Sequence, residues 1–140
     1  MAEPIKYFQG RYRWLSNFWS CFVTLDGVEY PSTENAYQAA KTLDPELRKP
    51  FQDCFPGVAK RDGRALPLRP DWDDVKYGVM EQLLRQKFAR GELRERLLAT
   101  GDAELIEGND WGDTWWGRDD KRGGQNKLGK LLMKIRAELR

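Results

Sequence analysis

The sequence has no histidine. That absence excludes Ser-His and Cys-His nucleophile pairs, and it excludes every zinc site with a histidine ligand. Only two cysteines are present, Cys21 and Cys54, and their separation fits neither a metal-binding pair nor a disulfide framework. We therefore predict free, buried thiols, no metal site and no cofactor. Any acid-base chemistry must come from Asp, Glu, Lys or Tyr side chains.

The sequence also lacks long apolar runs and a strong excess of either charge. No run approaches the roughly 18 residues that a membrane-spanning helix needs, and no apolar signal segment opens the chain, so we expect a soluble, cytoplasmic protein with no membrane partner. The net charge of +2 and the pI near 8.5 do not by themselves indicate nucleic acid binding. A local basic excess over residues 118–140 has two explanations, a solvated helix face or a site for an anionic ligand.

The residues that are present are typical of one folded domain. The chain has 140 residues, of which 40% are hydrophobic and 33% charged, a balance that argues against a disordered protein and supplies a core without disulfides. No repeat, low-complexity tract or linker interrupts it, so we predict a single domain over residues 1–140.

Strands are predicted near the start of the chain. Residues 5–8 have the composition of a short strand. Residues 21–25 and 28–30 flank Asp26-Gly27, which supplies the positive φ angles of a tight hairpin turn. Pro31 is predicted to end the hairpin.

Helices are predicted for most of the remaining chain. Ser32 is expected to cap a helix that reaches Leu43, and Asp71 to cap the clearest helix, which runs to about Arg90. The predicted helices cover residues 32–43, one or two short pieces within 45–62 that are broken near Pro56-Gly57, and residues 72–90, 92–99 and 126–140. The predicted fold class is mainly α (α+β), a single compact helical domain with a small N-terminal β-hairpin.

Residues 108–126 have the composition of a loop, yet they contain Trp111, Trp115 and Trp116. Flat aromatic faces suit stacking on a base or a sugar, and neighbouring glycines let a ligand approach the backbone closely. Polar residues such as Asp113 are interleaved with the tryptophans, which favours a binding loop. The alternative is a structural loop that folds back onto the core.

The segment from Gly124 to Lys130 is close to the phosphate-binding P-loop pattern. Leu131 replaces the Ser or Thr that binds magnesium, and no strand precedes the segment, so we exclude an NTPase. Gly123 and Gly124 still lead into a helix N-terminus, which can bind phosphate. The alternative is that Asn126 caps the helix after a flexible turn.

In the first predicted helix, Glu34, Gln38 and Lys41 fall on one face. The spacing alone favours a solvent-exposed face. If the face lines a pocket instead, the glutamate would serve as a general acid or base, and the lysine as a charge partner or an amine nucleophile.

Four stretches follow one another in an order that resembles a known family. They are Leu15-Ser16-Asn17-Phe18, the helix from Pro31 to Lys41, a central segment from Gly63-Arg64 through Asp71-Trp72 to Lys87-Phe88, and a C-terminal signature from Asn109-Asp110-Trp111-Gly112-Asp113 through Gly124 and Asn126 to Arg136. This pattern spans nearly the whole chain and resembles the NADAR family, also called YbiA-like. One departure is Asn35, because the family commonly has histidine there. We expect Asn35 to keep a hydrogen-bonding role.

The resemblance implies a mainly α domain with N-glycosidase activity. Such an enzyme hydrolyses the bond between ribose C1′ and an exocyclic base nitrogen. Some family members are ADP-ribosyl glycohydrolases that remove ADP-ribose from guanine bases, and others cleave phosphoribosylamino-pyrimidine intermediates of riboflavin synthesis. We expect the guanine substrate, with the riboflavin intermediates as the alternative.

The chemistry that the resemblance implies is mapped onto this chain as a hypothesis. Glu34 and Asp113 are expected to be the catalytic carboxylates. Lys41 is expected to stabilise an anion or to form an imine at C1′. The expected substrate-binding residues are Asn17, Phe18, Gln38, Arg64, Trp72, Trp111, Gly112, Gly124 and Asn126, with Lys60 as an alternative to Arg64 at a phosphate.

Two other functions remain open at this point. A non-catalytic module that binds ADP-ribose or another NAD derivative is compatible with Asn35. A structural or partner-binding domain would instead pack the three loop tryptophans inward. The partners implied by the leading hypothesis are a nucleotide-like ligand, DNA or RNA that carries the modification, and an ADP-ribosyltransferase toxin as counterpart.

Overall fold

The computed structural model describes residues 2–140, and its contacts group the chain into two compact units. The central unit is the continuous segment Asn17–Ala89. The terminal unit combines the N-terminal segment up to Ser16 with Arg90–Arg140. Each unit is described by itself. No helix in residues 2–140 has the length and apolar character needed to cross a membrane.

The predicted hairpin opens the central unit. Strands β1 (Ser20–Leu25) and β2 (Val28–Ser32) pair antiparallel, with Leu25 opposite Val28. The turn residues Asp26 and Gly27 have φ angles of 49° and 80°, as the turn prediction requires. The hairpin does not end at Pro31, because β2 continues to Ser32, which pairs with Ser20 beyond an irregularity in the register. The irregular stretch accommodates Pro31, which has no backbone N–H to donate to the sheet.

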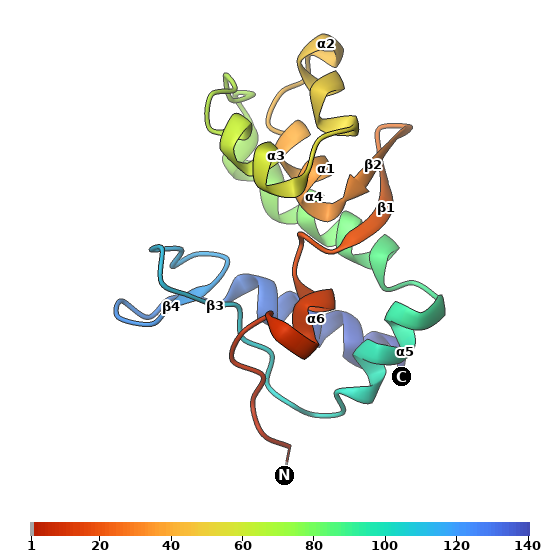
Figure 1. Ribbon diagram of the computed structural model, residues 1–140, viewed down its shortest axis with the longest axis vertical. Helices are drawn as coiled ribbons and strands as arrows, with labels where there is room; N and C mark the ends of the chain where they lie inside the picture. Colours follow the sequence, from red (N-terminus) through yellow and green to blue (C-terminus); the bar gives the residue numbers. More distant parts are fainter. Residues whose placement is uncertain (1) are drawn as a thin grey trace. The chain divides into compact units, whose positions relative to one another are not determined.

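Helix α1 (Thr33–Ala39) lies at the centre of this unit, against the hairpin, α3 (Pro56–Gly63) and α4 (Trp72–Lys87) (Figure 1). Every one of its residues is buried. It ends at Ala39 and not at Leu43 as predicted, and Leu43 is 59% exposed. The short helices α2 (Pro45–Arg48) and η2 (Lys49–Gln52) follow, and α3 begins at Pro56, at the position of the predicted break.

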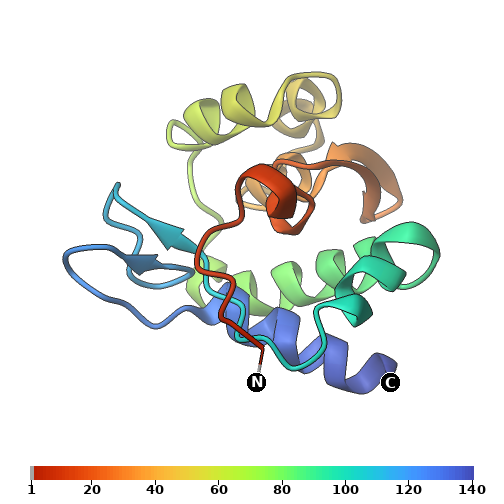
Figure 2. The same cartoon turned by 60° about the horizontal axis from the view of Figure 1, so that its bottom comes forward.

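The terminal unit contains η1 (Gly10–Leu15), α5 (Gly91–Ala99) and α6 (Lys127–Leu139). The predicted strand over residues 5–8 is wrong. Figure 2 draws this N-terminal segment as a coil, and of these four residues only Ile5 forms a bridge, to Leu105. Two-residue strands β3 (Gly108–Asn109) and β4 (Arg118–Asp119) pair in parallel within the tryptophan-rich loop. The apolar stripe of α6 is buried as its spacing predicts. The mainly α (α+β) class is therefore confirmed.

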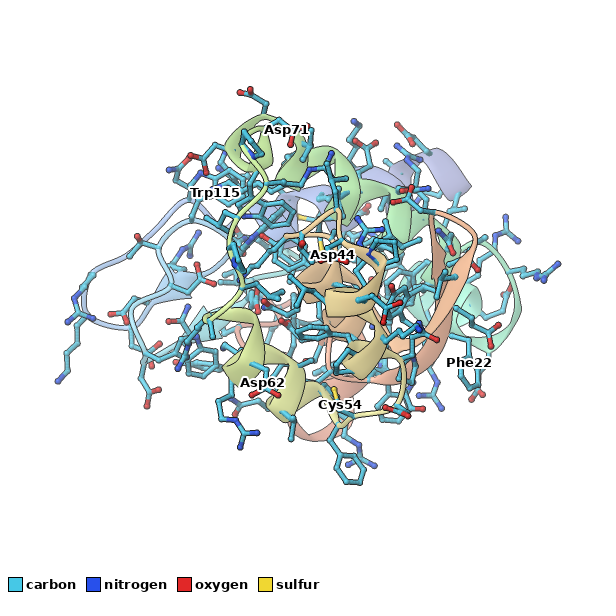
Figure 3. All side chains as sticks on the ribbon, turned by 90° about the horizontal axis from the view of Figure 1, so that it is seen from above. Phe22, Asp44, Cys54, Asp62, Asp71 and Trp115 are labelled. Carbon is cyan, nitrogen blue, oxygen red and sulfur yellow. The ribbon has the colours of Figure 1, made fainter. Side chains whose placement is uncertain are left out.

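Two predictions about single side chains need correction. Asp71, which is labelled in Figure 3, precedes α4. Its carboxylate makes no capping hydrogen bond to the helix. It binds Arg69 instead, at 2.6 Å from the guanidinium Nε. Cys21 and Cys54 are free thiols as predicted, but they are half-buried and not fully buried.

Candidate active site

The first turn of α1 places Glu34 by two hydrogen bonds to the backbone. The Ser32 hydroxyl accepts the N–H of Asn35 at 3.0 Å and caps the helix as predicted. The N–H of Glu34 donates to the carbonyl of Asn17 at 3.0 Å. The glutamate backbone is therefore held both by its own helix and by the segment that precedes β1.

The face that carries Glu34 and Gln38 is buried, so the prediction of a solvent-exposed face is wrong. Glu34 is 8% exposed and Gln38 is 5% exposed. The side-chain Nε2 of Gln38 donates to Oε2 of Glu34 at 2.6 Å. A carboxyl group is costly to bury unless it is hydrogen-bonded, and this bond supplies part of that compensation.

Lys41 lies just beyond the end of α1 and is half-buried. Burial lowers the pKa of its ammonium group, the nearby Glu34 carboxylate raises it again, and the Arg64 guanidinium lowers it. Its carbonyl accepts the N–H of Arg69 at 2.7 Å, which fixes the backbone at this point. The lowered pKa increases the fraction of neutral amine, the form that attacks carbon.

Basic and aromatic side chains that are exposed or half-buried accompany this cluster. Arg64 follows α3 and is exposed. The Lys60 ammonium lies 5.9 Å from the centroid of the Phe18 ring, and Phe18 is 42% exposed. These three predicted residues have the cationic and aromatic character that a nucleotide ligand needs.

Asn17 and Trp72, two further residues predicted to contact the substrate, are buried. The Asn17 amide donates to the Met80 sulfur at 3.5 Å, and its Oδ1 is buried without a hydrogen-bond partner in the described residues. Trp72 is 6% exposed, with its ring centroid 5.2 Å from that of Tyr37. Its contacts make Trp72 a core residue that supports α1 and not an open stacking face.

Asn35 has the hydrogen-bonding role that we predicted. Its Nδ2 donates to the carbonyl of Phe51 at 2.9 Å and to that of Cys54 at 2.8 Å. Its Oδ1 accepts the Ser32 hydroxyl at 2.5 Å. The side chain is fully buried, and its hydrogen bonds join α1 to η2 and to the segment that follows η2.

In the terminal unit, Asp113 organises the tryptophan-rich loop. Its Oδ1 accepts the backbone N–H groups of Trp115 at 3.1 Å and Trp116 at 2.9 Å. The side chain of Asn109 in turn binds the backbone of Asp113 through both of its polar atoms. These bonds give the Asp113 carboxylate a part in shaping the loop.

Sequence reasoning missed a second loop carboxylate, Asp119. It is 2% exposed, and its oxygens accept the N–H groups of Gly112, Lys121 and Arg122 at 2.8 to 2.9 Å. Those hydrogen bonds lower its pKa. The sequence offered no signal for this role, because Asp119 stands in a run of charged residues.

The three tryptophans of the loop differ in their exposure: one ring is exposed, and the other two pack against each other. Trp111 is 56% exposed and offers the kind of surface that stacks on a base. Trp115 and Trp116 are half-buried and pack edge to face, with centroids 4.5 Å apart. The Lys127 ammonium lies 5.1 Å from the Trp115 centroid.

Three other residues that we predicted to contact the ligand make close contacts within the protein. The N–H of Gly112 donates to Asp119, and a Cβ at Gly124 would collide with the backbone of Thr114. Asn126 does not cap α6. Its Oδ1 accepts the N–H of Glu107 at 2.9 Å and its Nδ2 donates to the carbonyl of Leu105 at 2.9 Å.

The prediction of a phosphate site at the start of α6 is also corrected. The N–H of Lys127 donates to the carbonyl of Trp115 at 3.1 Å, and that of Leu128 donates to the carbonyl of Trp116 at 2.9 Å. A helix N-terminus binds anions through N–H groups that lack partners. Here the loop carbonyls occupy the first two.

Known proteins similar to this chain are N-glycosidases and riboflavin biosynthesis proteins. The N-glycosidase YbiA of Escherichia coli (strain K12) is 41% identical over 128 residues, which cover 89% of this chain and 79% of the relative. An N-glycosidase of Nostoc punctiforme is 32% identical, covering 92% of this chain and 86% of that protein. A riboflavin biosynthesis protein of Vibrio vulnificus is 34% identical, covering 99% of this chain but 39% of that protein.

The fold comparison agrees with these relatives. The NMR structure of the Escherichia coli protein YbiA matches with a TM-score of 0.86 at 38% identity, covering 99% of this chain and 86% of that one. The class defined by these similarities is that of the N-glycosidases, and this protein is a glycosidase enzyme. A family model for the NADAR domain matches residues 6–140, so the chain belongs to the NADAR family.

Proposed function

We propose that the enzyme hydrolyses the bond between ribose C1′ and the exocyclic nitrogen of a guanine base, and so removes ADP-ribose. The observation that carries the proposal is the buried Glu34 carboxylate, hydrogen-bonded at 2.6 Å to Gln38 and close to Lys41. N-glycoside hydrolysis needs a carboxylate at C1′ in a site that excludes bulk water. Glu34 has that burial, and its backbone is held by α1 and by the carbonyl of Asn17.

In the proposed reaction the bond from C1′ to nitrogen breaks and positive charge develops on the ribose. Glu34 stabilises that charge or accepts a proton from the attacking water, whose oxygen becomes bonded to C1′. The departing nitrogen takes one proton, so the products are the free base amine and ADP-ribose. Asp113 is the proposed second carboxylate.

A second reaction route for the proposed hydrolysis uses Lys41 as a nucleophile. Its amine can attack C1′ of the ring-opened sugar and expel the base amine, which leaves an imine between Nζ and C1′. Water then hydrolyses the imine and regenerates the lysine. The lowered pKa of Lys41 supports this role, because attack requires the neutral amine. In the direct route the same side chain, when charged, stabilises an anionic group of the substrate.

The remaining parts of the substrate have complementary side chains. Arg64 and Lys60 are the proposed phosphate contacts, and Phe18 and Trp111 are the proposed aromatic surfaces. We propose DNA or RNA that carries the modified guanine as the partner. The counterpart is then an ADP-ribosyltransferase, the class of toxin that attaches this group.

A second candidate substrate is favoured by the names of two relatives. The proteins from Vibrio vulnificus and Zea mays are named riboflavin biosynthesis proteins. Phosphoribosylamino-pyrimidines also carry a ribose on an exocyclic nitrogen, so the same catalytic groups would serve.

The test compares the two substrates with three proteins. An oligonucleotide with ADP-ribose on one guanine amino group and a phosphoribosylamino-pyrimidine are each incubated with the wild type, Glu34→Gln and Glu46→Gln. Glu46 is an exposed glutamate in α2 and serves as the matched control. Products are identified by mass spectrometry.

The expected result is release of ADP-ribose by the wild type and by Glu46→Gln, with a rate at least about 100-fold lower for Glu34→Gln. Release of the pyrimidine alone would replace the guanine substrate with the riboflavin intermediate. Full activity in Glu34→Gln would remove Glu34 from the catalytic role. Tight binding of ADP-ribose without turnover of either substrate would leave the proposal without support.

A further inference from the structure

We infer that Gln38 acts as a positioning residue for Glu34, and that Gly63 is the residue that makes this position possible. The inference rests on the catalytic role proposed for Glu34. It differs from the sequence hypothesis, in which Gln38 contacts the substrate. Gly63 ends α3, which packs against α1.

One polar atom of the Gln38 side chain is hydrogen-bonded, and the other is buried against Gly63. Its Nε2 donates to Oε2 of Glu34 at 2.6 Å, while its Oε1 is buried without a hydrogen-bond partner in residues 2–140. An ionised carboxylate can only accept, so the donor end of the amide must face it. The acceptor end then faces Gly63, where no ligand can reach it without displacing protein atoms.

Gly63 leaves the space that the amide fills. A Cβ at this position would lie 2.7 Å from Cδ of Gln38 and closer still to its Oε1. Gly63 is buried in the last turn of α3, and its backbone does not adopt the left-handed conformation that favours glycine. Glycine weakens a helix relative to alanine, so the backbone does not account for glycine here. The Gln38 amide accounts for the glycine, because it occupies the space that a Cβ would need.

The same helix supplies a matched control. Gly57 lies in the first turn of α3, it is exposed, and nothing lies within 4 Å of a Cβ built there. Gly57→Ala and Gly63→Ala are therefore the same chemical change in the same helix. Only the second change pushes the Gln38 amide away from Glu34.

The first measurement is the kinetics of any substrate that the wild type hydrolyses. We expect Gly63→Ala, Gln38→Ala and Gln38→Met each to lower kcat about 10- to 100-fold with little change in KM, because they misplace a catalytic group without removing it. Gly57→Ala should stay within about twofold of the wild type. The double variant Gly63→Ala/Gln38→Ala should match Gln38→Ala alone, because both changes act through one side chain.

The second measurement does not depend on activity. The Glu34 carboxyl carbon is followed by 13C NMR during a pH titration of each folded variant. Loss of the Gln38 hydrogen bond removes an interaction that favours the charged carboxylate. The titration midpoint of Glu34 should therefore move to higher pH in Gly63→Ala and in both Gln38 variants, and should be unchanged in Gly57→Ala.

The two measurements separate this inference from the proposed function. If the wild type hydrolyses neither substrate but the Glu34 titration moves as expected, the proposed function fails and the positioning role stands. An unchanged Glu34 titration in the Gln38 variants would overturn the positioning role, whatever the substrate. If Gly63→Ala does not fold, the two Gln38 variants still decide the role of Gln38. An unaltered kcat and Glu34 titration in a folded Gly63→Ala would overturn the role of Gly63.

Discussion

At the scale of single residues, Lys41 separates the two chemical routes. If the lysine forms an imine with the ribose, sodium borohydride added during turnover should reduce it and leave a stable adduct on Lys41. Lys41→Arg keeps the charge but cannot form the imine, so it should lose the adduct and at least about 100-fold in kcat. Lys49→Arg, at an exposed lysine in η2, should keep both. Mass spectrometry of the intact protein measures the adduct.

The pH dependence of this trapping has a defined sign. The pKa of Lys41 is lowered by burial, so neutral amine is present at a lower pH than for an ordinary lysine. The adduct yield should therefore rise with pH and level off before an ordinary lysine is half neutral. Turnover without any adduct in the wild type would instead favour direct attack by water.

At the scale of the elements, Arg48 connects α2 to the end of α1 and to the hairpin turn. Its Nε donates to the carbonyls of Ala39 at 3.1 Å and Thr42 at 2.7 Å, and its Nη1 lies 2.8 Å from Asp26. The Asp26 side chain is 66% exposed, so solvent screens the ion pair. The bonds to the two carbonyls should therefore dominate.

This ranking predicts unequal effects of breaking the two kinds of contact. Arg48→Met should lower the free energy of unfolding by about 2 to 4 kcal/mol, because it removes the side-chain donor of the Thr42 carbonyl and leaves the Ala39 carbonyl only the N–H of Thr42. Asp26→Asn should cost less than about 1 kcal/mol, because asparagine also tolerates the left-handed turn conformation. Urea denaturation measures both values. Equal losses would show that the ion pair carries the connection.

The elements also show how far the sequence could predict this fold. Asp26-Gly27 and the α6 stripe predicted their structures because turn chemistry and helical periodicity are local signals. The burial of α1 was missed because a helix packed from several sides can carry Glu34 and Gln38 inside when they bind each other. The interior role of Asn126 depends on contacts with the distant backbone of Leu105 and Glu107, which no local pattern encodes.

The sequence predicted which residues make up the candidate site better than it predicted what each residue does. The residues Glu34, Gln38 and Lys41 do lie together, as one helix face requires. The role that we infer for Gln38 could not be predicted, because the position of its amide depends on Gly63, which is far from α1 in the sequence.

At the scale of the whole molecule, the chain has no histidine to titrate near neutral pH. A change of stability with pH in that range must come from other groups whose pKa is shifted. Burial lowers the pKa of Lys87 to about 7, and Cys21 opposes that shift. Lys87 is 3% exposed. Between about pH 7 and the ordinary lysine range, the unfolded chain binds this proton and the folded chain does not. The free energy of unfolding attributable to Lys87 should therefore rise with pH across that interval.

The corresponding variant is Lys87→Met. Below about pH 7 the wild type keeps a buried charge that methionine lacks, so Lys87→Met should gain stability relative to the wild type most strongly at low pH. The difference should shrink as the pH rises toward 10. Lys134→Met, at an exposed position on α6, should show no such trend. Urea denaturation at pH 6, 8 and 10 measures it, and a difference independent of pH would contradict the expectation.

The chain order of the two units has a consequence for biosynthesis. The backbone of Ile5 pairs with Glu104 and Ile106, so its partners leave the ribosome long after it does. The central unit is continuous and can make its own contacts in the meantime. The N-terminal segment must wait without its partners, and closing so long a loop is a slow, entropically costly step. During translation, the helix that carries Glu34 can thus form before Ile5 pairs with residues 104–106.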